Sequence, residues 1–283
     1  MRKKSSTPFR LKETLELTYP VLGLWYEESV PPNAATVIEG RSRAAVRGCA
    51  LFLVARAFKG DMVAFTPESG ICPGASIGLG LPPNPCAYFP GGHEALLRYM
   101  SDGNESSPEG RAEAVRLRAE GIREAVVMEY LEGEGFKKDP VLADDYHRIS
   151  YPPLKPETGV VVLRPIVTGD LERPPKVALM LADALQLSAL VVLANFARPG
   201  VDNVRIPLAP GCSSLAAIPL HEAGMENPKA VVGLVDLAAR RHMGRILKRM
   251  YLSMSVPWSL YTEMEKNVDS SFLSRSFWKK MLV

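Results

Sequence analysis

The chain has 283 residues, of which 47% are apolar, 23% charged and 7% aromatic. This composition excludes the disordered and fibrous classes of protein, and a chain of this length buries a sizeable core without disulfides or metals. The formal net charge is only +3, so we expect no nucleic-acid partner.

Two segments indicate in which cellular compartment the protein is expected. Residues 1–10 are basic and polar, with no apolar stretch behind them that would serve as a signal peptide. Residues 177–197 mimic a membrane span, but Asp183 lies near the middle, where an aspartate costs about 2.5–3.5 kcal/mol. A helix followed by a strand explains this segment better. We therefore expect a cytoplasmic protein without a membrane segment.

The first half of the chain mixes helical and extended patterns. Ser107 and Pro108 are a typical N-cap and first residue of a helix. Residues 66–85 are dense in Gly and Pro and indicate a loop. In this half we expect helices near 9–17, 44–58, 93–100, 108–120 and 140–148, and strands at 21–26, 62–65 and 125–130.

The second half alternates more regularly. We expect helices at 177–187, 211–221 and 236–250 and a last one from Pro257, with strands at 160–166, 189–196, 204–208, 230–234 and 251–256. Such alternation predicts an α/β (or α+β) protein, a mixed sheet with flanking helices. Residues 1–283 form a single domain in this interpretation, and two intimately packed lobes, 1–150 and 151–283, are the alternative.

Four cysteines are the best functional lead. In a reducing compartment Cys49, Cys72, Cys86 and Cys212 do not form structural disulfides and are thiols, ligands or nucleophiles. Small residues let a cofactor approach the backbone, so Cys72 and the glycines that follow it are a candidate cofactor site. Those glycines are Gly74, Gly78 and Gly80.

The settings of the other three cysteines differ. Cys212 follows a Pro-Gly pair where a helix begins, and a helix N-terminus lowers the pKa of a thiol. Cys86 lies in a Pro-rich segment. Cys49 has apolar neighbours, and core packing is its alternative role. Four thiolates suit an iron–sulfur cluster, but no C-x-x-C spacing occurs, so the fold would have to unite them.

The order of these features resembles the uncharacterised ArCR family (domain of unknown function 169). The matching pieces are Cys49 in a helix, the run Cys72-Pro73-Gly74-Ala75, the run Gly211-Cys212-Ser213 and the segment 252–272. The resemblance spans most of the chain and implies a cytosolic protein, but the family supplies no activity. Some relatives have a further cysteine and an arginine where this chain has Val235-Asp236 and Arg240, which leaves Cys86 as the fourth thiolate.

Basic residues offer a second lead. Arg241, Arg245 and Lys248 share one helix face that would hold a phosphate, a carboxylate or an acidic partner, unless it is simply a solvated face. His93 and His221 would build a Cys–His pair only if folding unites them with a thiol.

The leading hypothesis is therefore a cysteine-lined site for an iron–sulfur cluster or another thiolate-bound metal, in a redox or ligand-activation role. Its metal ligands are Cys49, Cys72, Cys86 and Cys212, and its cofactor-binding residues are Cys72, Gly74, Gly78, Gly80 and Arg245. The alternatives are a non-catalytic module that binds a small anion or metabolite and a homo-oligomeric scaffold. The sequence names no reaction.

Overall fold

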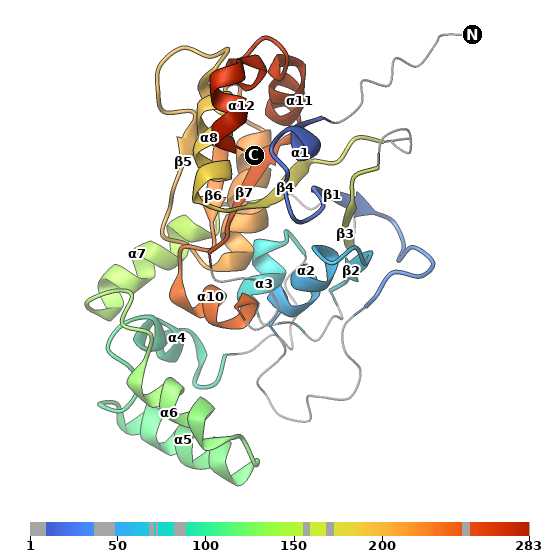
Figure 1. Cartoon of the computed structure of the whole chain (residues 1–283). Helices are drawn as coiled ribbons and strands as arrows, with labels where there is room; N and C mark the ends of the chain where they lie inside the picture. The colour runs from blue at the N-terminus through green and yellow to red at the C-terminus, as the bar shows by residue number, and fades with distance from the viewer. Residues whose placement is uncertain are drawn as a thin grey trace.

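The computed structural model describes residues 10–36, 49–67, 71, 73–81, 89–154, 159–167, 173–244 and 250–282. Over these residues the chain forms a seven-stranded mixed sheet with helices packed on it and a group of further helices to one side (Figure 1). The expected α/β fold, a mixed sheet with flanking helices, is confirmed.

The sheet has the strand order β2-β3-β1-β4-β7-β6-β5. Neighbouring strands are antiparallel except β5 and β6, which are parallel. Strands from both sides of residue 150 alternate in this one sheet, and the division into lobes 1–150 and 151–283 stays a prediction. The strands are β1 (Leu22–Glu27), β2 (Val63–Phe65), β3 (Val160–Pro165), β4 (Val177–Ala182), β5 (Val204–Arg205), β6 (Ala230–Gly233) and β7 (Leu252–Pro257).

Successive residues of a strand point to opposite faces of the sheet, and the central strand β4 is buried on both. Leu179 and Leu181 join the core under one face, whereas Ala178 and Met180 join the core under the other. The first face is covered by α2 (Leu51–Ala57), α3 (Pro73–Gly78), the π-helical turn η1 (Ser213–Ala217), α9 (Ile218–Ala223) and α10 (Leu237–Met243). The second face is covered by α1 (Leu11–Thr14), α8 (Ala184–Asn195) and α11 (Trp258–Asn267).

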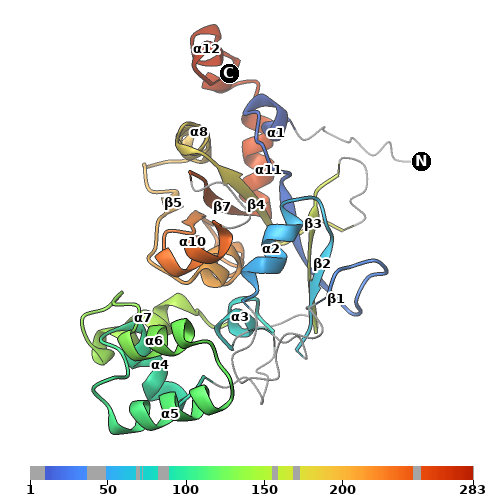
Figure 2. The ribbon, with the colours of Figure 1, turned by 60° about the horizontal axis from the view of Figure 1, so that its bottom comes forward.

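Four helices form a separate group, which we call the helical unit. It consists of α4 (Gly92–Met100), α5 (Pro108–Ala119), α6 (Glu124–Glu132) and α7 (Pro140–Ser150) and has a small core of its own around Leu117, Val127 and Tyr130. As predicted, Ser107 caps α5, by accepting the N–H of Gly110. Figures 1 and 2 both place the helical unit beside α3 and α10, at one end of the sheet body.

Two predictions of element type are wrong. The strand expected at 125–130 is helix α6, which buries Val127, Tyr130 and Leu131 at helical spacing. The helix and strand expected within 177–197 occur in the reverse order, strand β4 and then helix α8. The reason is Asp183, whose side chain accepts the N–H of Gln186 and starts the helix with a capping box.

The remaining differences concern helices that were not predicted and the ends of elements. The glycine-rich segment expected as a loop contains α3, and the helix expected from residue 44 is described only from Leu51 as α2. The helix from Pro257 is not the last one, because η2 (Phe272–Ser274) and α12 (Ser276–Leu282) follow it. In the part of the chain that the structure describes, no helix has both the length and the apolar character needed to cross a membrane.

Candidate functional site

Cys212 lies in the first turn of an unusual helix. This helix runs from 211 to 223 and contains the π-helical turn η1 directly after Cys212. Single π-helical turns inside α-helices are frequent at functional sites. Gly211 is needed at the start, since a Cβ there would lie 2.7 Å from the Cβ of Ala239. The half-buried thiol thus sits at the positive end of a long helix dipole.

Helix α3 packs closely against Cys212 and Tyr151 through two of the glycines that the sequence singled out. A Cβ on Gly78 would lie 3.3 Å from Sγ of Cys212, and one on Gly74 would lie 2.6 Å from the hydroxyl of Tyr151. Gly80, at the end of α3, has a φ of +69°, which suits glycine. Gly74 and Gly78 are therefore packing residues at Tyr151 and Cys212, whereas Gly80 is a turn residue next to Tyr26. A cofactor-binding role for the three glycines stays a prediction.

Cys49 lies near the same helix start. It directly precedes the first turn of α2, and both Cys49 and Cys212 pack, partly buried, against the core under the first face of the sheet. A Cβ on Gly211 would lie 3.0 Å from the side chain of Leu51, two residues after Cys49. The starts of α2 and of helix 211–223 are thus adjacent. Figure 2 shows α2, α3 and α10 on the same side of the sheet.

The other proposed ligands are not described. Cys72 and Cys86 lie outside the described residues, and so does Arg245. Among the residues that are described, no three His, Cys, Asp or Glu side chains gather closely enough to hold a metal ion. The four-cysteine site therefore stays a prediction.

The helical unit meets the sheet body at Cys212. Tyr151 directly follows α7, and its hydroxyl lies 3.8 Å from Sγ of Cys212. The hydroxyl of Ser213 donates a hydrogen bond to the carbonyl of Ser150, the last residue of α7. We call this contact region the joint. Its side chains are Tyr99, Glu129, Glu134, Tyr146 and Tyr151 from the helical unit and its flanks and Cys212, Asp236 and Arg241 from the sheet body.

Asp236 is the most buried charge of the joint. Its side chain is only 3% exposed and caps α10 by accepting the N–H of Ala239 at 2.6 Å, while Oδ2 has no hydrogen-bond partner among the described atoms. Burial raises the pKa of Asp236 to about 6, although the nearby N–H groups of Ala239, Ala238 and Gly211 act in the opposite direction. Asp236 and Cys212 thus share the positive start of helix 211–223.

Other groups of the joint are shifted in the same direction. Burial, followed by the charges of Asp236 and Glu129, raises the pKa of Glu134 to about 7. Burial also raises the pKa of Tyr146, with smaller contributions from Asp236, Glu134 and Cys212. Glu129 accepts hydrogen bonds from Tyr99 and Arg241. Perturbed groups gathered between two packed units are typical of functional sites.

Two histidines extend the joint towards solvent. His147 stacks at a tilt on Tyr151, with ring centroids 5.1 Å apart, and His93 lies 5.5 Å from His147. The exposed Asp144 accepts from or pairs with Nε2 of His93 at 3.3 Å. The sequence singled out His93 for its distance from Cys86 along the chain, but not its approach to His147 and Tyr151, which depends on the packing of α4 against α7. The neighbouring Asp145 pairs with Arg148 instead.

The basic run is largely engaged where it is described. Arg240 donates to the carbonyls of Leu234 and Tyr251, and Arg241 pairs with Glu129. Arg245 and Lys248 lie outside the described residues. The described part of α10 therefore serves structure, and the anion-binding alternative depends on residues that the structure does not describe.

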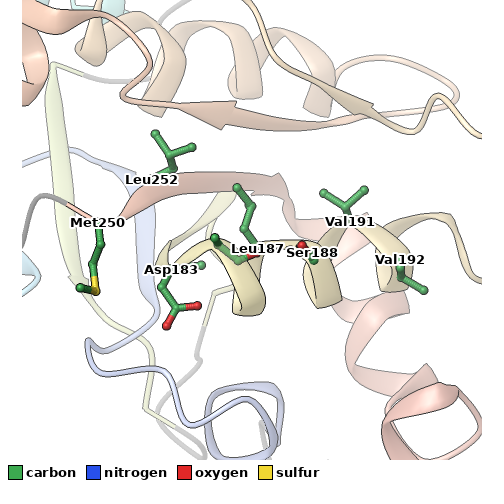
Figure 3. Close-up of a pocket in the computed structure, with 9 residues that line it drawn as sticks. Asp183, Leu187, Ser188, Val191, Val192, Met250 and Leu252 are labelled. Carbon is green, nitrogen blue, oxygen red and sulfur yellow. Dashed lines mark hydrogen bonds between the residues drawn. The ribbon is translucent and has the colours of Figure 1, made fainter. Parts of the chain in front are cut away.

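A hollow of about 500 Å³ lies on the other face of the sheet, between α8 and the start of β7 (Figure 3). Its walls are mostly apolar, and its one carboxylate, Asp183, already caps α8. Because it opens on the face opposite Cys212 and lacks converging polar groups, we do not assign the chemistry to it. It is lined by Ala182, Asp183, Ala184, Leu187, Ser188, Val191, Val192, Met250 and Leu252.

Comparison with known proteins identifies one relationship. The model of a family described as uncharacterised ArCR, a domain of unknown function, matches residues 10–267 and so includes the helical unit, the sheet and both described cysteines. The chain matches no curated protein and no solved structure.

Proposed function

We propose that this chain, which belongs to the uncharacterised ArCR family, binds a metal centre through cysteine thiolates. Because the family has no described activity, the role of the chain has to be argued from its own residues. The proposed site holds an iron–sulfur cluster or another soft metal centre next to the joint. Cys212 is the central ligand, and its role is redox or ligand activation.

The observation that carries the proposal is the meeting of helix starts around Cys212. Cys212 is in the first turn of helix 211–223, Cys49 precedes α2, and α2 packs against Gly211. In the sequence, Cys72 directly precedes α3, whose first turn packs at Gly74 against Tyr151 beside Cys212. The last residue of α3, Gly78, packs against Cys212 itself. Helix N-termini favour thiolates over thiols, and thiolate is the form that binds soft metals.

Each residue has a part in this proposal. Cys212 and Cys49 are the two ligands from the described chain, Cys72 is the third and Cys86 the fourth. Gly74 and Gly78 keep side chains away from the site, so that α3 can approach it closely. An iron–sulfur cluster takes four cysteine thiolates, whereas a zinc ion also takes four ligands but accepts nitrogen or oxygen among them.

The test is the metal content of protein purified without oxygen. We expect iron with acid-labile sulfide, or zinc, in an amount comparable with the protein, and visible absorption if iron is present. Replacing a ligand with serine removes a soft thiolate, so Cys212→Ser and Cys72→Ser should each lose most of the metal. Met225→Leu is the matched control, because it removes an exposed sulfur elsewhere on the body.

Two results would count against the proposal. One is anaerobically purified protein that contains no iron, zinc or sulfide. The other is metal that persists unchanged in Cys212→Ser, since the bound metal would then lie at some other site.

A further inference from the structure

Helix α12 carries exposed aromatic side chains. The side chain of Phe277 is 70% exposed and that of Trp278 is 37% exposed. Their rings lie edge to face with centroids 5.0 Å apart, and Trp278 meets Phe272 of η2 in the same geometry at 6.2 Å. We call Phe272, Phe277 and Trp278 the terminal aromatic cluster.

The two exposed rings of the cluster do not contribute to the packing of the sheet body. α12 packs mainly on η2, and Leu273 of η2 is the residue that is buried in the core under the second face of the sheet. In the part of the chain that the structure describes, neither Phe277 nor Trp278 joins a buried core. Large apolar side chains that gather in the open on one element indicate a contact with something outside the chain.

The charge around the cluster is positive. The segment 270–283 has no acidic residue and three basic ones, whereas the whole chain has a formal net charge of only +3, so the rest of the chain is neutral as a whole. The basic residues are Arg275, Lys279 and Lys280. Both Arg275 and Lys280 are exposed, and Asp269, the nearest acid along the chain, pairs with Arg10 instead.

We propose that α12 docks on the surface of an anionic lipid bilayer. The terminal aromatic cluster enters the interfacial layer, where aromatic rings are favoured, and the basic residues face the acidic headgroups. Lys280 follows Phe277 by three residues and so lies on the same side of α12. Its long side chain reaches the headgroups while the ring lies deeper, as is usual for lysine at an interface.

The size of α12 fixes the kind of contact. It has seven residues, whereas a helix that crosses a bilayer needs about 20, so α12 lies along the surface. An anchor this small binds reversibly and depends on apolar contact and charge together. Figures 1 and 2 place α12 at the opposite end of the molecule from the helical unit, so docking leaves the joint away from the bilayer. The inference is independent of the proposed metal site.

The experiment measures how much full-length protein sediments with lipid vesicles. Vesicles of phosphatidylcholine with about 25% phosphatidylserine are compared with vesicles of phosphatidylcholine alone. We expect binding to the anionic vesicles only, and much weaker binding at about 0.5 M salt, because salt screens exposed charges. Tryptophan emission should shift to the blue on binding, and this shift should be lost in Trp278→Phe, which keeps a ring at this position.

Single substitutions test the two parts of the contact. Phe277→Ser removes a ring from the interface and should weaken binding about tenfold, and Lys280→Gln removes one charge and should weaken it about fivefold. Each has a matched control elsewhere on the molecule. Val141→Ser on α7 removes an apolar side chain that is 80% exposed, and Lys59→Gln removes an exposed lysine after α2. Both controls should bind like the parent.

Equal sedimentation with both kinds of vesicle, or none with either, would overturn the inference. The same conclusion follows if Phe277→Ser and Lys280→Gln both bind like the parent. A chain that does not bind vesicles but forms dimers, which Phe277→Ser abolishes, would show that the cluster contacts a second copy instead of a lipid surface. Because no readout involves a metal, a negative metal analysis leaves this test unaffected.

Discussion

At the scale of single residues, the joint concentrates acids that are costly to ionise. Asp236 is almost fully buried, with a pKa raised to about 6, and Glu134 has a pKa raised to about 7. Each binds protons more readily in the folded chain than in the unfolded one. The folded state is therefore favoured at low pH by these two groups, and that stability is lost as the pH rises through their folded pKa values.

Asp236→Asn tests this directly. Asparagine keeps the N-cap of α10 but has no charge to bury. Between pH 4 and pH 7 the free energy of unfolding of the variant should therefore fall much less than that of the parent. The shift of Asp236 corresponds to about 2–3 kcal/mol. Urea unfolding at several pH values measures it. The exposed Asp145→Asn is the control and should keep the parent slope; an unaltered slope in Asp236→Asn would contradict the account.

Residue patterns predicted part of the candidate site. The glycine-rich run and the position of Cys212 at a helix start followed from local sequence. The approach of Tyr151 to Cys212 did not, because it depends on the packing of α7 against η1. Asp236 carried only a weak signal, an aspartate before a helix, and nothing local indicated that it would be buried beside another helix start.

At the scale of elements, the start of α8 carries a capping pattern in the sequence, but the apolar residues around it outweighed this pattern in the prediction. The apolar run 177–182 has no alternation because β4 is buried on both faces, and Val191 and Val192 favour a strand by propensity. The spacing of Asp183 and Gln186, a capping box, fixes the true boundary. In α6 the pair Val126 and Val127 likewise favours a strand by propensity, but this helix begins without a side-chain cap.

Removing the cap should destabilise the fold measurably. Asp183→Ala leaves the N–H of Gln186 without its side-chain acceptor and should lower the free energy of unfolding by about 1 kcal/mol, whereas Asp183→Asn should retain most of it. Urea unfolding at pH 7 measures both. Ser188→Ala, on the exposed side of α8, should change stability by less than about 0.5 kcal/mol. Equal stability of Asp183→Ala and the parent would show that the capping box is not what sets this helix start.

At the scale of the whole molecule, the alternation of helices and strands was sufficient to predict an α/β fold but not the topology. β1 lies between β3 and β4, so strands distant in the sequence pair with each other, and such long-range pairing is not encoded in any local pattern. The position of the helical unit likewise depends on contacts between residues distant in the sequence. Its helices were largely predictable one by one, but its contact with the sheet body at Cys212 was not.

That contact brings together the thiol of Cys212, the ring of Tyr151 and the buried acids, and the central claim is that a soft metal centre is bound next to them. The most direct measurement is X-ray absorption at the metal edge of anaerobically purified protein. We expect sulfur scatterers at about 2.3 Å from the metal. In Cys212→Ser most of the metal should be lost, and any metal that stays should have one sulfur scatterer fewer. A metal surrounded only by nitrogen and oxygen, or a sulfur shell identical in Cys212→Ser, would contradict the account.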